Sequence, residues 1–388
     1  MLIMLIFGGA GILFLAMSLN ALFHLRWVRR LPSLKALAAT QRFQDTEERR
    51  IRCSAVIAAR DEQMRIGETI RHLLVQQGVE IEVIVVDDRS VDQTGDIVKR
   101  LAKEDARVRI RRVDTLPEGW LGKSHACHIG AGAATGEWIL FTDADCWLKP
   151  DVVSRAVSVA DIERVDHITL TPGLSEANLG AQAWHLAFLI SIANWISGAN
   201  RDRPAAYFGI GAFNLVRAPA YRECGGYEAL RLTVLDDVKL GLLLRRAGKR
   251  TRGFIGGDDV ECHWGTTVRS MIQVMEKNYF AALDFRTGTA LAAGLAGCLL
   301  LCAAVLGPLT GTVMGLGAGL APLSFILPAG ILARRLGWSW RAAALTPFIF
   351  PVLLYAMLKS AFFTLRQGGV RWRETFYSLE VLRKSTVR

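Results

Sequence analysis

Two short acidic motifs follow apolar runs in the first half of the chain. Asp87–Asp88 ends the apolar run that begins at Glu82, and the D-x-D motif Asp143–Asp145 follows the run Trp138–Thr142. Such runs predict buried strands, and ligands of open α/β sheets bind at the carboxyl ends of the strands. Carboxylate oxygens bind hard divalent cations, and such a cation neutralises a diphosphate leaving group. The two motifs therefore predict a site for a metal ion and a phosphorylated ligand.

The segment after Asp87 also fits a simpler interpretation. Asp92 and Thr94 have the residue types that cap the start of a helix. A strand followed by a capped helix would explain these two residues. It would leave Asp87 without a role, so the functional interpretation is favoured.

A third acidic pair, Asp236–Asp237, precedes an apolar-faced helical pattern over residues 238–247. One of these carboxylates would serve as a general base that deprotonates an acceptor hydroxyl. The alternative is that both are acids of a first helical turn, where the helix dipole favours them. The sequence alone leaves both interpretations open.

His263 lies in the short sequence Cys262–Gly265, after the third acidic pair. An imidazole at this place would bind the metal ion or contact a phosphate. A purely structural histidine is the alternative.

The composition of the 388-residue chain indicates a membrane protein with a sizeable soluble domain. Hydrophobic residues make up 51% of the chain, the mean hydropathy is +0.27 and the formal net charge is +11. A basic, apolar chain suits a membrane with anionic lipids, whereas scattered Lys and Arg residues without a nucleic-acid motif argue against nucleic-acid binding. The seven cysteines include no C-x-x-C pair and indicate free thiols in a reducing compartment.

Residues 1–25 contain no Asp, Glu, Lys or Arg and are long enough to span a bilayer as one helix. Arg26, Arg29 and Arg30 follow, so the positive-inside rule predicts that the next domain is cytoplasmic. The charges follow the apolar segment and none precede it, which argues against a cleaved signal peptide. Residues 26–50 are then a basic connector.

Residues 51–285 have the pattern of a soluble α/β domain. Strands are predicted at Ser54–Ala59, Glu82–Asp87 and Trp138–Thr142, and amphipathic helices at Gly67–Gln77 and Asp92–Glu104. The alternation of strands and helices predicts a mostly parallel sheet with helices on both faces.

Residues 286–365 are predicted to form C-terminal transmembrane or interfacial helices. No charged residue occurs from Thr287 to Ala333, a run long enough for two spans with a turn near Gly307–Gly311. A third apolar segment, Ala342–Leu365, contains two prolines and a lysine. Three spans would place the basic tail, residues 366–388, outside the cytoplasm, against the positive-inside rule. The third segment is therefore predicted to lie in the membrane interface, which leaves the tail cytoplasmic.

The order and spacing of these motifs resemble those of the family 2 glycosyltransferases, which have the Rossmann-like GT-A fold, over residues 54–283. Val56–Glu62 resembles the first-strand sequence V-I-x-A-R-x-E. Gly122–Gly130 resembles the G-K-x-x-A segment before the D-x-D motif, and Gly225–Tyr227 the G-G-[FY] turn before the acidic pair. The Q-x-x-R-W element of the processive polymer synthases is missing, which argues against polymer synthesis.

This resemblance implies roles for individual residues. Asp87 would bind the uracil or ribose side of a nucleotide-sugar donor, a UDP-sugar by family likeness. The other implied donor contacts are Ala59, Arg60, Glu62, Asp88, Lys123 and Asp143. Asp145, with Asp143 and His263, would hold Mn²⁺ or Mg²⁺, and Asp237, with Asp236 as the alternative, would be the base of an inverting displacement.

A narrower resemblance concerns the acceptor. Leu116–Lys123 is similar to the L-P-x-G-W-x-G-K signature of bacterial glycosyltransferases associated with hopanoid and carotenoid biosynthesis, which share the layout of N- and C-terminal helices. It implies sugar transfer to a hopanoid, carotenoid or other polyisoprenoid lipid of the bacterial inner membrane, with a cytoplasmic catalytic domain. Alternatives are transfer to a polyprenyl phosphate carrier, and a non-catalytic membrane module that retains a nucleotide-binding fold.

Overall fold

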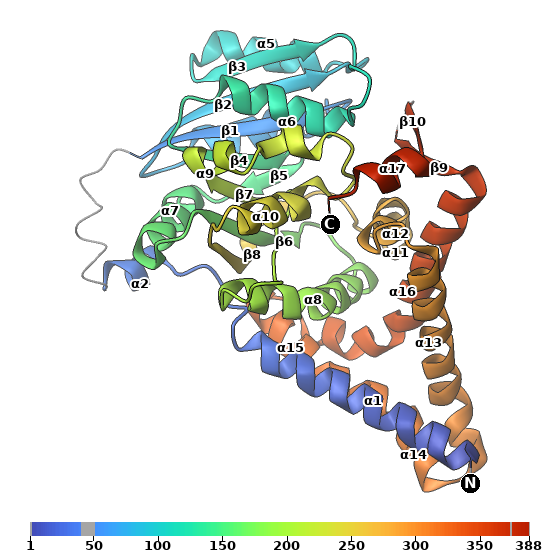
Figure 1. Ribbon diagram of the computed structural model, residues 1–388. Helices are drawn as coiled ribbons and strands as arrows, with labels where there is room; N and C mark the ends of the chain where they lie inside the picture. The colour runs from blue at the N-terminus through green and yellow to red at the C-terminus, as the bar shows by residue number, and fades with distance from the viewer. Residues whose placement is uncertain (1, 40–50, 373–374, 388) are drawn as a thin grey trace.

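The computed structural model describes residues 2–39, 51–372 and 375–387. The chain forms an α/β domain on one eight-stranded sheet, with a frame of long apolar helices beside it (Figure 1). The α/β class with flanking apolar helices, predicted from the sequence, is confirmed. Residues 40–50 of the predicted connector lie outside the described residues.

The sheet has the strand order β3-β2-β1-β4-β7-β6-β8-β5. Its strands are β1 (Arg52–Ala59), β2 (Glu80–Asp88), β3 (Val108–Val113), β4 (Trp138–Asp143), β5 (Cys146–Leu148), β6 (His167–Leu174), β7 (Asn214–Arg217) and β8 (Thr251–Cys262). β1 pairs in parallel with β2 and β4, and β6 with β8, whereas β7 and β5 run antiparallel to their neighbours. The three predicted strands are β1, β2 and β4, which are buried along most of their length, as a helix-covered sheet requires.

Pairing of β1 with both neighbours places two acidic motifs at one edge of the sheet. Ala59 lies opposite Asp87 on β2, and Ala58 lies opposite Asp143 on β4. The carboxyl ends of three strands therefore meet where the sequence predicted a ligand site.

The helices of the α/β domain connect the strands and cover the sheet. They are α4 (Ile66–Leu74), α5 (Thr94–Glu104), α6 (Gly122–Ala133), α7 (Val152–Glu163), α9 (Ala218–Glu223) and α10 (Asp236–Arg246), with a short α2 (Leu34–Ala38) before the sheet. α4 and α5 are the two predicted helices. α5 begins at Thr94, whose backbone N–H donates to the Asp92 carboxylate over 2.9 Å, so Asp92 precedes the helix and orders its start.

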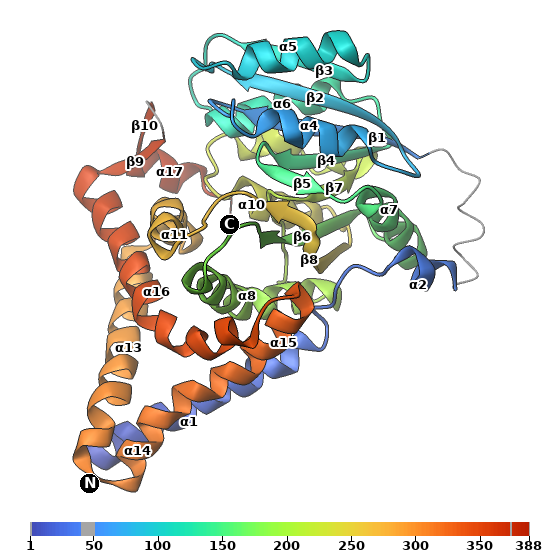
Figure 2. The same ribbon diagram turned by 180° about the vertical axis from the view of Figure 1, so that it is seen from behind.

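One long apolar helix, α8 (Leu179–Asn200), lies within the segment predicted to be soluble. It contacts β8, α1 and α16 and so joins the sheet to the apolar frame (Figure 2). α8 is itself long and apolar enough to cross a membrane, although more than half of it is buried within the protein. The sequence analysis missed it because a buried core helix and a spanning helix have similar composition.

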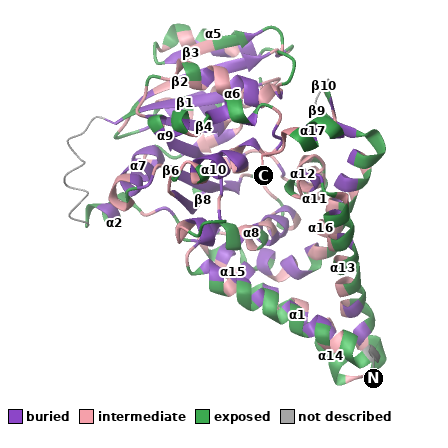
Figure 3. Cartoon of the chain, in the orientation of Figure 1, coloured by how far each residue is buried: buried purple, intermediate pink, exposed green. Residues whose placement is uncertain are grey.

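The apolar frame consists of α1 (Leu2–Leu25), α13 (Thr287–Leu306), α14 (Val313–Leu320), α15 (Ile326–Leu336) and α16 (Trp340–Gln367). The described residues contain five candidate membrane spans: α1, α8, α13, the segment Val313–Leu336 and α16. Nη1 of Arg335 on α15 donates to the Leu25 carbonyl of α1 over 2.8 Å and so joins two helices of the frame, and α15 also contacts β8 of the sheet. In Figure 3 the helices α1, α13 and α14 show long exposed stretches, which include the apolar residues Leu5, Ile12, Leu19, Leu291, Leu295, Leu299 and Val313. Such an apolar surface suits a lipid environment.

The third C-terminal segment is continuous helix in spite of its prolines. α16 has 28 residues and contains Pro347 and Pro351. It runs first along α8 and then turns to run beside α13 (Figures 1 and 2). Prolines inside a helix are a common cause of such a bend. Its placement in the membrane interface stays a prediction.

The described part of the predicted basic tail, residues 366–388, contains secondary structure. It includes the antiparallel strand pair β9 (Gly369–Trp372) and β10 (Thr375–Ser378) and the helix α17 (Leu379–Ser385). Leu382 is fully buried, and Arg383 donates to the Phe285 carbonyl over 2.9 Å. The C-terminal segment therefore packs against the end of the α/β domain, beside two further short helices, α11 (Val268–Met275) and α12 (Asn278–Ala282).

Candidate active site

One cavity of about 930 Å³ is lined by acidic residues from each of the three motifs. Asp88, Asp143 and Asp145 line it from the sheet, and Asp236–Asp237 line it from the first turn of α10. The other walls come from α6, α8, the connection between α11 and α12, and α16. Its size suits a small-molecule substrate rather than a single ion.

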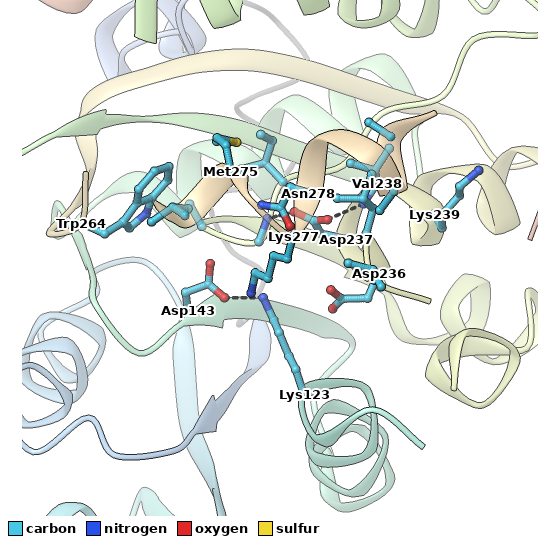
Figure 4. A pocket seen from close by; sticks show the side chains of 18 of the residues that line it. Lys123, Asp143, Asp236, Asp237, Val238, Lys239, Trp264, Met275, Lys277 and Asn278 are labelled. Atoms are coloured by element: carbon cyan, nitrogen blue, oxygen red, sulfur yellow. Dashed lines mark hydrogen bonds and ion pairs between the residues drawn. The ribbon is translucent and has the colours of Figure 1, made fainter. Parts of the chain in front are cut away.

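Lys123 and Asp143 form the centre of the cavity (Figure 4). Lys123, from the first turn of α6, places its Nζ 2.5 Å from Oδ1 of Asp143. Gly211 lies against this pair and leaves no room for a side chain, because a Cβ atom there would lie only 2.8 Å from Oδ2 of Asp143 and 3.1 Å from Nζ of Lys123. Burial lowers the pKa of Lys123, but the nearby carboxylates, with Asp143 first among them, together outweigh burial and raise this pKa well above its usual range. The lysine is therefore a fixed positive charge at the ends of the strands.

The D-x-D carboxylates converge in a way that suits a cation. Ligand atoms of Asp143, Asp145 and Cys146 all lie within 4.8 Å of one another. Burial, and then the charge of Asp143, raise the pKa of Asp145 to about 6, so a bound cation would favour its charged form. Burial also raises the pKa of the Cys146 thiol well above its usual range, which leaves the two carboxylates as the hard oxygen donors.

The acidic pair of α10 is both a first-turn pair and part of the cavity. Oδ2 of Asp237 accepts from the Gly211 N–H over 2.7 Å, and Oδ1 accepts from the Val238 N–H over 2.8 Å. Burial, and then Asp236, raise the pKa of Asp237 to about 6. Oδ2 of Asp236 is buried and has no hydrogen-bond partner among the described residues. Asp237 is thus held in a defined orientation with raised basicity, as a general base requires.

Asp87 and Asp88 have different surroundings. Asp87 is fully buried, binds Nη1 of Arg112 over 2.5 Å and accepts from the Ser90 N–H over 3.0 Å. It is not among the described residues that line the cavity, whereas Asp88 is. The cavity wall beside Asp88 also contains Ala59, Arg60 and Glu62, three residues implied as donor contacts by resemblance.

The structure does not bring His263 into the group of Asp143 and Asp145. Its ring lies 3.5 Å from that of Trp147, between centroids, and its Nδ1 is 3.4 Å from Nη1 of Arg65. Among the described residues the carboxylate group includes Cys146 and not His263. The His263 backbone N–H donates to the Asp145 carbonyl over 3.0 Å, so the residue lies next to the D-x-D motif, and its role as a metal ligand stays a prediction.

Sequence analysis missed Lys277, which lies between α11 and α12 and lines the cavity. Burial, and then the charge of Lys123, lower the pKa of Lys277 to about 8. Tyr377 of β10, for which no role in the site was predicted, also lines the cavity and donates to the Trp120 carbonyl over 3.1 Å. Only the tertiary fold brings these two residues to the acidic residues.

A parallel half-sheet that ends in a D-x-D motif, with a second acidic pair across the cavity, is the arrangement of a GT-A fold. Residues 54–225 match the family model described as Glycosyl transferase family 2. The mannosyltransferase PcManGT from Pyrobaculum calidifontis, solved in complex with GDP-Man and Mn²⁺, is similar over 93% of this chain and 99% of that chain. The TM-score is 0.54 at 16% sequence identity, so this similarity shows the fold alone.

A curated relative is similar over a shorter segment. The 4,4'-diaponeurosporenoate glycosyltransferase of Staphylococcus aureus (strain NCTC 8325 / PS 47) is 38% identical over 104 residues. The match spans about a quarter of both proteins, 26% of this chain and 26% of the relative. It supports the family and its carotenoid-related branch.

Proposed function

We propose that the protein transfers a sugar, with inversion, from a nucleotide-sugar donor to an apolar lipid of the membrane. The observation that carries this proposal is the shape of the cavity, which joins the acidic residues to an apolar wall built by side chains of α8 together with Met357 of α16. Both helices are long and apolar enough to cross a membrane. A soluble acceptor would need no such wall.

The donor would occupy the sheet end of the cavity. Asp88, Arg60 and Glu62 line the part where the nucleoside would lie, and Lys123 stands where a diphosphate would place its charge. The buried Asp87 would act indirectly, because its carboxylate holds Arg112 and the Ser90 backbone beneath this surface. The neighbour PcManGT holds a GDP-sugar, and family resemblance favours a UDP-sugar, so both donors enter the test.

Asp143 and Asp145 would hold a divalent cation, Mn²⁺ or Mg²⁺, which supplies positive charge against the leaving diphosphate. Asp237 accepts the proton of the acceptor hydroxyl as that oxygen bonds to the anomeric carbon. On the opposite face, the bond from the anomeric carbon to the diphosphate oxygen breaks and the nucleoside diphosphate leaves with the bonding electrons. Attack opposite to the leaving group inverts the configuration.

The acceptor would lie along one face of α8. Phe188, Ile192 and Trp195 follow one another at helical spacing and line the cavity, with Met357 of α16 also in the wall. Trp195 is 44% exposed, and its ring lies 5.2 Å from that of Tyr207. These side chains suit a polyisoprenoid chain, such as a carotenoid or hopanoid, better than a polar sugar.

The membrane is proposed to be the bacterial inner membrane, with the catalytic domain on the cytoplasmic side. The five candidate spans and the arginines that follow α1 support this placement. An apolar acceptor would then reach Asp237 laterally without leaving the lipid.

The test uses the full chain, purified in detergent and reconstituted in vesicles. Labelled UDP- and GDP-sugars are supplied with Mn²⁺ and extracted bacterial lipids that contain carotenoids, hopanoids and polyprenyl phosphates. We expect label in the organic phase, on a carotenoid or hopanoid. Label only on polyprenyl phosphate, or only in water-soluble products, would contradict the proposed acceptor class.

A further inference from the structure

Lys277 lies on the wall of the cavity that faces the sheet. It belongs to the connection between α11 and α12, near the end of the α/β domain and far along the chain from Lys123. Figure 4 shows that the side chains of Lys123 and Lys277 enter from opposite walls and end close together beside Asp143. Two lysine side chains of different elements therefore converge at the point where the donor's phosphates would lie.

Such a pair needs an explanation, because like charges repel inside a cavity. The charges of Asp143, Asp236 and Asp237 act on Lys277 as well and offset part of the repulsion. A ligand with two or more negative charges would offset the remaining repulsion between the lysines, since it would contact both ammonium groups at once. A diphosphate has that charge and can span two cations.

We propose that Lys277 binds the donor's diphosphate opposite Lys123, so that the leaving group is held between the two walls. This proposal rests on the proposed use of a nucleotide sugar. It gives the binding site a second half, which comes from the segment that leads into the membrane helices rather than from the sheet.

The position of Lys277 depends on α16. Its neighbour Glu276 forms an ion pair with Lys359 of α16, with 2.7 Å between Oε2 and Nζ. The Phe280 N–H, one turn further on, donates to Oγ of Ser360 over 3.0 Å in a buried environment. An apolar helix of the frame thus holds the segment that carries the second lysine, and Lys359 is a positioning residue for it.

An anionic acceptor headgroup, such as a carboxylate or a phosphate, has the same chemistry as the donor's diphosphate. The two sources differ in what Lys277 changes. As a donor contact it controls the affinity for a nucleoside diphosphate in the absence of acceptor. As an acceptor contact it controls only the KM for the lipid.

The experiment measures binding of UDP and GDP, each with Mn²⁺, to the full chain in detergent by calorimetry. Lys277→Met is expected to weaken binding of the preferred nucleoside diphosphate about 10- to 100-fold, the range for a charged hydrogen bond, and to affect the monophosphate less. Lys277→Arg is expected to restore part of the affinity, which shows that the variant site is folded. Lys359→Met is expected to weaken binding several-fold, whereas Lys384→Met, which removes an exposed ion pair of the same 2.7 Å length with Glu380, is expected to leave it unchanged.

Three results would overturn the proposal. Equal diphosphate affinity of the wild type and Lys277→Met would remove Lys277 from the donor site and leave the glycosyltransferase function intact. Unchanged diphosphate affinity with a raised KM for the lipid would assign the lysine to the acceptor. No binding of either nucleoside diphosphate by the wild type would instead contradict the nucleotide-sugar function itself.

Discussion

The two ends of the cavity are built in different ways. At the sheet end, carboxylates and Lys123 are fixed by the ends of strands and the starts of helices, and their partners lie within 2.5 to 3.0 Å. At the other end, side chains of α8, α11 and α16 offer apolar surface, and Trp195 is still 44% exposed. The comparison teaches that donor chemistry demands individual residues at set positions, whereas an apolar acceptor demands only a surface of suitable shape.

The largest effect is expected from loss of the cation. EDTA should abolish sugar transfer by the purified protein, and added Mn²⁺ or Mg²⁺ should restore it, because the converging carboxylates need a counter-charge to hold a diphosphate. Asp145→Ala should be inactive although its thermal unfolding temperature stays near that of the wild type. Full transfer in the presence of chelator would contradict a metal site at the sheet end of the cavity.

The next effect concerns the base. Asp237→Asn keeps the shape and the contact from the Gly211 N–H, but it removes the proton acceptor. We expect turnover to fall about 10² to 10⁴-fold, the range for general-base catalysis, with binding of the nucleoside diphosphate nearly unchanged. Asp236→Asn is the matched control, and a larger loss of turnover in that variant would show that Asp236 is the base.

The sequence predicted the sheet end far better than the apolar end. β1, β2 and β4 followed from their apolar runs, and Asp143 and Asp237 from their places after a strand and at a helix start. α8 was missed because its composition fits the interior of the domain as well as a membrane. Lys277 was missed because its position depends on a contact between its neighbour Glu276 and Lys359 of α16. Lys359 lies more than 80 positions further along the chain.

His263 shows the limit of reasoning from residue type. A histidine near a predicted metal site has suitable chemistry, yet its ring packs against Trp147 and lies near Arg65. Both neighbours are distant in sequence. The Pro-containing helix α16 illustrates the same point, because packing on α8 and α13 sustains a helix that local propensity disfavours.

The apolar end should respond to substitution in a different way from the sheet end. Trp195→Ala removes an exposed aromatic surface from the proposed acceptor path, and we expect kcat/KM for the lipid to fall about tenfold. Hydrolysis of the nucleotide sugar in the absence of lipid should not change. Asn194→Ala, at an exposed neighbouring position of α8 that is not part of the cavity wall, should behave as the wild type. Equal lipid kinetics in both variants would take this face of α8 out of the acceptor path.

The smallest expected effect is on the pH dependence of turnover. Asp237 must be deprotonated to accept a proton, and its pKa is raised to about 6, so activity should be lost as the pH falls through this value. At pH 5.5 only about a quarter of such a group is charged, so turnover should be about fourfold below its value at neutral pH. An unperturbed aspartate would keep full activity at that pH. A flat profile between pH 5 and pH 7 would show that the raised basicity of Asp237 is not used.

The most direct measurement of the central claim compares lipids from cells. Lipid extracts of a strain that lacks the gene are analysed by mass spectrometry, after complementation with the wild type or with Asp237→Asn. The account predicts a glycosylated apolar lipid that is present only with the wild type, together with accumulation of the unglycosylated lipid in the other strains. Identical lipid profiles in all strains, with the wild-type protein expressed and folded, would contradict sugar transfer to a membrane lipid.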